Sequence, residues 1–428
     1  MKVAIYTLGC KVNQYETQAM EQELLARGHT LTEFSDEADA YIVNTCSVTA
    51  VSDQKSRQVI HGVQRKHPGA VVAVCGCYPQ THADDVRKLG VDLISGTGDR
   101  TGFIRLLEEA AAEKRQIEAI DQPFERRGFE VLPAGGLGGR TRAMLKVEDG
   151  CVNFCTYCII PYARGRVRSL PVPTAVEQTR ALAAEGYREI VVTGIEISSW
   201  GQDLKNGETL IDLLEAVCTA APAVRIRLGS LEPRTITEEF CRRAAALPNL
   251  CPQFHLSMQS GCDDTLKRMN RKYDTARYYE SIKLLREVFQ HPAITTDLIV
   301  GFPQETEDEF AQTLAFLRRC AFSSMHIFPY SRRPGTPAAA MEGQIPRHVQ
   351  EDRARRAAAV AAELEQDYLS ALVGATLPVL FEEEKDGLWQ GHAPNYVPVR
   401  VQGEDLHNQL RPVEITGIKG STLVGRLL

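Results

Sequence analysis

The sequence predicts an α/β protein with an N-terminal parallel α/β domain, a partial (β/α)6 barrel and a small all-β barrel of the OB-like kind. Three observations support this prediction. Strand-like runs alternate with helical patterns near the N-terminus, six more such runs recur from Met144 onward, and short β-rich pieces follow Leu377. Strands that alternate with helices are typical of parallel sheets. We place the three domains at residues 1–135, 136–368 and 369–428.

Three cysteines mark the ends of the strands predicted in the first domain. The strands are residues 3–9, 40–46 and 71–77, and the helices are residues 14–27, 53–66 and 101–113. Cys10, Cys46 and Cys77 stand at the carboxyl ends of these strands. Such ends lie along one edge of a parallel sheet, where ligands bind. We therefore predict that the three thiols meet and hold a metal-sulfur cluster.

Two alternatives remain open for these cysteines. Free cysteine often behaves as a small buried hydrophobe. Cys75 also competes with Cys77, because strand alternation points both side chains the same way. We favour Cys77, which follows Gly76 at the point where the strand ends.

A Gly-rich stretch at residues 133–139 predicts a flexible connection to the barrel. The barrel strands are predicted at residues 143–147, 189–194, 225–230, 253–258, 293–301 and 324–330. Helices with a 3.6-residue apolar rhythm are predicted at residues 175–185, 210–220, 237–246 and 278–289. Six such units indicate a partial barrel, with its active site at the carboxyl ends of the strands. A long helix at residues 347–369 straps this barrel or links it to the last domain.

The first barrel strand leads into the motif C-x3-C-x2-C, formed by Cys151, Cys155 and Cys158. Zinc in a structural site takes four ligands, and no Cys or His follows closely enough to supply the fourth. Grouped thiolates are the usual ligands of iron–sulfur clusters. We therefore predict a cluster held by three thiolates, which leaves one iron open to bind substrate.

Polar residues and glycines follow the other strands on the same face. We expect Gly194, Glu196, Ser230 and Gln259 to form a binding pocket there. Glycine would let the backbone approach a ligand closely.

The composition is that of an ordinary soluble protein: 428 residues, 43% hydrophobic, 24% charged and a net charge of −6. The N-terminus lacks a secretory pattern, and no stretch approaches the roughly 20 apolar residues that span a bilayer. Twelve cysteines then indicate a reducing, cytoplasmic compartment. The cysteines without shared spacing are expected to be packing residues: Cys218, Cys241, Cys251, Cys262 and Cys320.

The last sixty residues predict five short strands, in a barrel of a kind that often binds RNA. Trp389 and Tyr396 could stack on bases, although a role in the core is at least as plausible for either. Acidic residues outnumber basic ones in this segment.

With these motifs assembled, the chain resembles the radical S-adenosylmethionine (SAM) methylthiotransferases over nearly its full length. The matching stretches are TLGCKVNQYET, NTCSVT, GCYPQ, DGCVNFCTYCIIPYARG, LSMQSG, MNRKY, TDLIVGFPQETEDEF and PYSRRPGTPA. LGCKVN and NTCSVT are most similar to the branch that acts on threonylcarbamoyl-adenosine in tRNA. The alternatives are methylthiolation of isopentenyl-adenosine and, from another class, a non-catalytic zinc-carrying RNA-binding protein.

The resemblance implies an N-terminal domain with a second 4Fe-4S cluster, a radical-SAM core and a C-terminal TRAM domain. Cys151, Cys155 and Cys158 would hold the cluster that cleaves SAM, and Tyr157 fits the same pattern. Cys10, Cys46 and Cys77 would hold the second cluster, which carries the sulfur. The implied reaction places a methylthio group on carbon 2 of the modified adenosine in the tRNA anticodon loop. A reducing electron donor such as a flavodoxin or ferredoxin is implied as a partner.

The chain departs from the family pattern where Thr193-Gly194-Ile195-Glu196 replaces Gly-Gly-Glu, which puts Glu196 in doubt as a ligand of the SAM amino group. The acidic last domain suggests that tRNA is gripped elsewhere. Two basic groups are candidates: Arg164, Arg166 and Arg168, and then Lys267, Arg268, Arg271 and Lys272.

Overall fold

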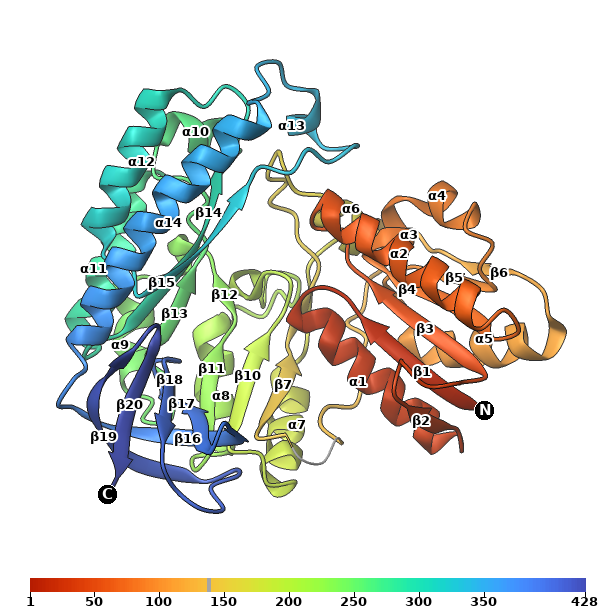
Figure 1. The fold of residues 1–428 in the computed structure, drawn as a ribbon, viewed down its shortest axis with the longest axis horizontal. Helices are drawn as coiled ribbons and strands as arrows, with labels where there is room; N and C mark the ends of the chain where they lie inside the picture. The colour runs from red at the N-terminus through yellow and green to blue at the C-terminus, as the bar shows by residue number, and fades with distance from the viewer. Residues whose placement is uncertain (137–139) are drawn as a thin grey trace.

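The computed structural model describes residues 1–136 and 140–428. It shows an N-terminal α/β body, a central body of parallel strands backed by helices, and a small C-terminal barrel (Figure 1). Residues 137–139 of the predicted Gly-rich connection lie outside the described residues. Within the described part of the chain, no helix has both the length and the apolar character needed to cross a membrane.

The N-terminal sheet has six parallel strands in the order β2-β1-β3-β4-β5-β6. The strands are β1 (Lys2–Thr7), β2 (Thr30–Thr32), β3 (Ala40–Thr45), β4 (Val71–Gly76), β5 (Leu93–Ser95) and β6 (Ile117–Ala119). The helices are α1 (Lys11–Ala26), α2 (Ala50–Lys66), α3 (Cys77–Thr81), α4 (Ala83–Arg87) and α5 (Arg100–Glu113). Sequence periodicity missed β2, β5 and β6, because three residues are too short to show a period of two. Apolar side chains pack on both faces of this sheet, as expected for a parallel sheet.

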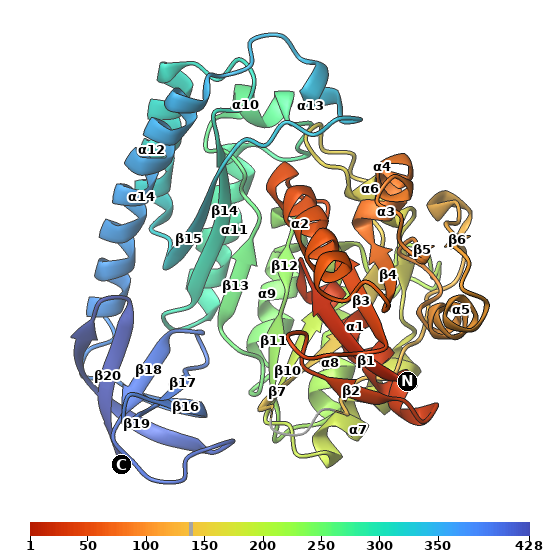
Figure 2. The same ribbon diagram turned by 45° about the vertical axis from the view of Figure 1, so that its right-hand side comes forward.

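The central body follows the predicted partial barrel, with its parallel strands in chain order. They are β7 (Arg142–Lys146), β10 (Glu189–Thr193), β11 (Arg225–Leu228), β12 (Ser230–Leu231), β13 (Gln253–Leu256), β14 (Ala293–Val300) and β15 (Ser324–Pro329). The third predicted strand is divided into β11 and β12 at Gly229, so the sheet has two parts, joined by a bridge between Ile226 and Leu250. Helices cover the outer side: α7 (Val172–Ala184), α8 (Leu210–Ala220), α9 (Glu238–Ala245), α10 (Asp263–Arg268), α11 (Thr275–Val288) and α12 (Glu307–Cys320). Figure 2 shows the N-terminal body against the open side of this curved sheet.

Helix α14 (Arg347–Ser370) packs along the barrel and leads to the last domain (Figure 1). Val360 and Leu364 join its core, which agrees with the predicted strap. The strands β16 (Thr376–Lys385), β17 (Leu388–His392), β18 (Pro398–Val401), β19 (Leu410–Lys419) and β20 (Thr422–Leu427) form a closed barrel. Trp389 is buried in its core. The ring of Tyr396 stacks on His392 and lies 4.6 Å from the Arg227 guanidinium, so it already has partners within the protein.

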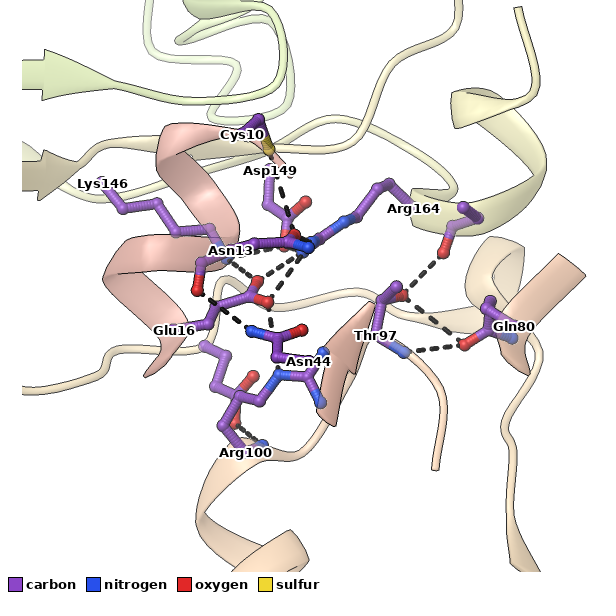
Figure 3. A network of polar contacts seen from close by, with 12 residues as sticks. Cys10, Asn13, Glu16, Asn44, Gln80, Thr97, Arg100, Lys146, Asp149 and Arg164 are labelled. Atoms are coloured by element: carbon purple, nitrogen blue, oxygen red, sulfur yellow. Dashed lines mark hydrogen bonds and ion pairs between the residues drawn. The ribbon is translucent and has the colours of Figure 1, made fainter. Parts of the chain in front are cut away.

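A buried ion cluster joins the N-terminal body to the partial barrel (Figure 3). Glu16 of α1 pairs with Arg164, with Lys146 at 3.0 Å and with Arg100 at 3.3 Å. Arg164 ends the short helix α6 (Ile160–Arg164), and Lys146 ends β7. Asp149, in the two-residue strand β8 (Glu148–Asp149), also accepts from Lys146 at 2.8 Å. One carboxylate of the first domain therefore holds two cations of the second.

The Glu16 carboxylate is ionised at neutral pH. Burial alone would raise the pKa of Glu16, but Arg164, Lys146 and Arg100 outweigh that effect and hold the pKa at about 2. Because burial has removed these groups from water, their attraction is little screened. Removing one partner of such a group leaves uncompensated buried charge.

Replacing Glu16 with Gln should destabilise the protein strongly while keeping its shape. We expect the free energy of unfolding to fall by about 3–5 kcal/mol, because three buried cations lose their shared counterion. Urea unfolding at pH 7 measures the change. The matched control is Glu23→Gln on the same helix, since Glu23 pairs with Arg27 at 3.6 Å near the surface. Equal stability of the two variants would show that the buried cluster contributes nothing.

Candidate active site

Cys10, Cys46 and Cys77 lie at one edge of the N-terminal sheet, each just after a parallel strand. Cys10 precedes the first turn of α1, Cys46 follows β3, and Cys77 is the first residue of α3. Burial raises the pKa of the Cys77 thiol to about 12, Arg164 opposes this, and Cys46 and Cys10 add to it. The three thiols are therefore close enough to interact electrostatically.

Glycine next to Cys10 makes room for this approach. Gly9 has a φ of +111°, and a Cβ built there would lie 2.8 Å from the Cβ of Cys46 and 3.1 Å from its Sγ. Asn13 holds the same loops, because its Nδ2 donates to the carbonyls of Leu8 at 2.8 Å and Thr45 at 2.9 Å. Only glycine combines this backbone conformation with the close packing.

Cys75 occupies a different environment from Cys77. It lies inside β4, fully buried in the apolar core beneath the sheet with Val3 and Leu93. Gly76, at a φ of +102°, ends the strand, and Cys77 begins a helix. Strand alternation therefore ends at Gly76, so it does not point the side chains of Cys75 and Cys77 the same way.

Cys151, Cys155 and Cys158 lie on the loop between β8 and α6. The antiparallel pair of β8 with β9 (Arg168–Ser169) closes the base of this loop. Burial raises the pKa of the Cys158 thiol to about 12, and the neighbouring Cys155 adds to the increase. Burial also raises the pKa of Cys151, with Glu196, Cys158 and Cys155 contributing. Neutral thiols in the folded chain would thus have to lose protons when they bind a metal.

Arg271 lies directly against this thiol group, with its Nη1 3.1 Å from the Sγ of Cys155. Its Nε donates to the Tyr273 hydroxyl at 2.9 Å. Tyr157 packs against Phe302, edge to face, with ring centroids 6.5 Å apart. Arg271 therefore places a positive charge directly beside this thiol group.

The predicted ligand-binding residues lie next to the ends of neighbouring strands of the partial barrel. Gly194 follows β10, and a Cβ there would lie 2.8 Å from the Glu148 carboxylate. Glu196 donates its backbone N–H to that carboxylate at 2.7 Å. Ser230 begins β12 and is exposed, whereas the backbone of Gln259, at a φ of +69°, bridges to β14.

Glu148 and Arg271 are site residues that sequence reasoning did not assign. Glu148 is completely buried, its Oε1 has no hydrogen-bond partner, and burial raises the pKa of its carboxyl well above the ordinary value. Its position three residues before Cys151 was the available signal. Arg271 stood in the conspicuous MNRKY stretch but was considered only for RNA contact.

Several arginines proposed for RNA contact are not available to RNA. Arg164 is committed to the buried ion cluster, and buried Arg168 donates to the carbonyls of Arg164 and Arg166. Arg268 pairs with Glu309 at 2.7 Å. The exposed members of the two basic groups are Arg166, Lys267 and Lys272.

A cavity of about 750 Å³ lies between the Cys10 loop, the inner face of the barrel strands and the C-terminal barrel. Cys10, Gly194 and Ser230 line it. The other five predicted ligand cysteines lie outside its lining. Among residues 1–136 and 140–428, no three His, Cys, Asp or Glu side chains are grouped to hold one metal ion. Ligands of an iron–sulfur cluster bind different irons, so they need not converge on one point.

Comparison with known proteins finds relatives that are similar along the whole length of the chain. Residues 2–96 match the Uncharacterized protein family UPF0004, and residues 145–317 match the Radical SAM superfamily. The threonylcarbamoyladenosine tRNA methylthiotransferase MtaB of Bacillus subtilis is 38% identical, covering 96% of this chain and 93% of that one. MtaB of Aquifex aeolicus is 36% identical (94% and 97%). The tRNA-2-methylthio-N(6)-dimethylallyladenosine synthase of Pelotomaculum thermopropionicum is 32% identical (100% and 97%).

Among solved structures, the radical S-adenosylmethionine methyltransferase TsrM of Kitasatospora setae has a similar fold. Its TM-score is 0.58 at 16% identity, covering 79% of this chain and 74% of that one. The cobalamin-dependent S-adenosylmethionine radical enzyme OxsB has a TM-score of 0.54 at 12% identity, covering 85% and 56%. These likenesses concern the fold.

Gly9→Ala should prevent formation of one metal-sulfur centre and leave the other. The added methyl group overlaps the Cys46 side chain at a backbone conformation that L-residues rarely adopt. We expect about four irons per chain instead of about eight after anaerobic reconstitution, measured by iron analysis and visible absorption. Gly28→Ala is the control, because Gly28 also has a positive φ but no neighbour within 4 Å of an added Cβ. Full iron content in Gly9→Ala would contradict the placement of Cys46.

Glu196 should make the stability of the cluster-free protein depend on pH. Burial, with Glu232 nearby, raises the pKa of Glu196 from 4.5 to about 7. The stability due to its bound proton is complete below about pH 4.5 and is lost as the pH rises through 7. Between pH 5 and pH 8, the free energy of unfolding of Glu196→Gln should therefore rise by about 3 kcal/mol relative to that of the wild type. Urea unfolding measures this change. The exposed Glu177→Gln serves as control, and parallel pH profiles for Glu196→Gln and the wild type would refute this account.

Proposed function

The chain belongs to the radical-SAM methylthiotransferase family, and we propose that it adds a methylthio group to carbon 2 of threonylcarbamoyl-adenosine beside the anticodon of tRNA. The relatives named MtaB support this substrate, since three of them are 35–38% identical over more than nine-tenths of the chain. The dimethylallyl-adenosine enzyme is also similar, at 32%. A non-catalytic zinc protein has no support among these relatives.

One observation carries the reaction: two groups of three thiols stand on domains that a single buried ion cluster joins. Cys10, Cys46 and Cys77 belong to the first, and the loop from Cys151 to Cys158 belongs to the second. Arg164 connects them, because its Nη2 donates to Asn13 at 2.9 Å and the Cys10 Sγ lies 3.9 Å from the same Asn13 oxygen. A transfer between two centres requires such a fixed relation.

The residues present fit two 4Fe-4S clusters and SAM. Each group offers three thiols, and each has a cation beside it, Arg164 near Cys77 and Arg271 against Cys155. The buried Nε of Arg164 and both Nη atoms of Arg100 lack hydrogen-bond partners, so positive charge remains to balance anionic clusters. When bound, these groups would supply a 5′-deoxyadenosyl radical and a sulfur for transfer.

Residues of the chain then bind, orient and shield. Glu196 and Gly194 are proposed to meet the amino acid part of SAM, and Ser230 and Gln259 complete that pocket. Tyr157 and Phe302 form an apolar wall beside the thiol loop. Cys46, Cys77 and Cys155 are buried, which limits the access of water to the reacting centres and so prevents side reactions.

The tRNA would enter the central cavity from the exposed side. Arg166, Lys267 and Lys272 are the exposed members of the two basic groups, and we propose that they contact phosphates. A reducing protein such as a flavodoxin or ferredoxin is proposed to deliver electrons, and the reaction places the protein in the cytoplasm with its tRNA.

Mass spectrometry of tRNA nucleosides tests the proposal. A deletion strain should lose 2-methylthio-threonylcarbamoyl-adenosine and accumulate its unthiolated precursor, and this chain should restore it. Loss of the 2-methylthio form of isopentenyl-adenosine instead would assign the runner-up substrate.

Cys77→Ala should abolish methylthiolation but retain reductive SAM cleavage, because the group from Cys151 to Cys158 is intact. Methionine and 5′-deoxyadenosine are measured by chromatography, alongside the modified nucleoside. Cys75→Ala is the matched control, because Cys75 is separated from Cys77 only by Gly76 and lies in the core. We expect Cys75→Ala to retain methylthiolation. Activity in Cys77→Ala and none in Cys75→Ala would reverse the ligand assignment.

A further inference from the structure

Lys11 is an exposed cation at the wall of the central cavity. It follows Cys10 directly, begins α1 and lines the cavity together with Tyr396 and Arg227. Among the residues that the structure describes, none forms a hydrogen bond or an ion pair with its ammonium group within 4 Å. Its ammonium group is therefore open to solvent and to a ligand that enters the cavity.

The surrounding charges explain why Lys11 has no partner within the protein. Glu189 supplies the negative charge that acts on Lys11, yet it already pairs with Arg142 at 3.1 Å, Arg225 at 2.7 Å and Arg227 at 2.8 Å. Arg227 and Arg142 repel the Lys11 ammonium, and Glu189 attracts it. Three guanidinium groups thus share one buried carboxylate, and Lys11 adds a further positive charge at the cavity wall.

Two acidic residues also line the cavity, and each has a partner of its own. Asp297 lies 3.2 Å from His255, and Glu365 accepts from Ser421 at 2.6 Å. Uncharged polar residues, among them Thr193 and Ser230, line the same cavity. The cavity therefore suits a ligand with one anionic group and several neutral polar groups.

The substrate of the proposed function has this chemistry. A threonylcarbamoyl group ends in a carboxylate and carries a hydroxyl and a carbamoyl group, whereas an isopentenyl group is apolar. The substituent is attached at carbon 6 of adenine, and carbons 2 and 6 flank the same ring nitrogen. A residue beside the reacting carbon can therefore reach the substituent, and Lys11 adjoins Cys10 of the sulfur-carrying group.

We propose that Lys11 binds the threonyl carboxylate of the substrate adenosine and thereby selects it over adenosines with neutral or apolar substituents. This inference rests on the proposed function and adds the residue that sets its substrate choice. An ammonium group paired with a carboxylate in a partly desolvated site gives a strong, charge-assisted hydrogen bond. A neutral substituent would leave Lys11 uncompensated, which adds discrimination against it.

The test compares RNA binding by the full-length, reconstituted protein. Two anticodon stem-loops are used, one with threonylcarbamoyl-adenosine and one with unmodified adenosine at the same position. Lys11→Met should weaken binding of the modified stem-loop by roughly 10- to 100-fold and leave the unmodified one unchanged. Lys11→Arg should keep most of the preference. Lys205→Met, an exposed lysine outside the cavity, is the control for the loss of one charge.

Other outcomes would overturn the assignment. Equal weakening for both stem-loops would mean that Lys11 contacts an RNA phosphate. A loss of SAM affinity in Lys11→Met without RNA, measured by equilibrium dialysis, would assign Lys11 to the carboxylate of SAM. Visible absorption must first show that Lys11→Met carries both clusters. If it does not, the binding comparison is made with Lys11→Gln and Lys11→Arg. An equal preference of these two variants for the modified stem-loop refutes the inference.

The same samples separate this inference from the proposed function. If the wild type methylthiolates the modified stem-loop and Lys11→Met retains the wild-type preference in binding, the carboxylate site is wrong and the proposed function stands. If the wild type does not methylthiolate the modified stem-loop, the proposed function fails and the assignment of Lys11 fails with it.

Discussion

The buried ion cluster around Glu16 is the interaction on which the arrangement of the site depends. It joins α1, which begins beside Cys10, to β7 and α6, which flank the loop from Cys151 to Cys158. Replacing it with apolar contacts would cost little stability on general grounds. The cluster instead fixes how the two domains are oriented. A guanidinium group with several fixed partners tolerates little sliding between them.

The thiols and their cations form a second theme of the structure. Burial holds the pKa of Cys77 and Cys158 near 12, so both are protonated at neutral pH when no metal is bound. Metal binding must release those protons and replace them with positive charge. Arg164 and Arg271 lie beside the thiols that would bind metal, and both already have partners within the protein.

Much of this fold could be predicted from local patterns, and the failures share one cause. Patterns of a few residues indicate the strand ends at Cys10 and Cys46. The same holds for the six-unit barrel and for the C-terminal barrel. The partner of Arg164 does not, since Glu16 lies 148 residues away and only the folded chain brings them together. For the same reason, Arg164, Arg168 and Arg271 resembled surface cations in the sequence although they are occupied inside the protein. Strands of three residues such as β5 depend on the neighbouring strands for their existence.

The C-terminal barrel is fastened to the first half of the partial barrel. Arg225 donates to the carbonyls of Pro378 and His392, Arg227 donates to that of Pro394, and Arg142 pairs with Glu382. The C-terminal barrel therefore covers these three arginine side chains. A chain that ended before residue 369 would leave these three guanidinium groups without their C-terminal partners. Arg227 would remain at the wall of the central cavity, where a polyanion in the cell could bind it.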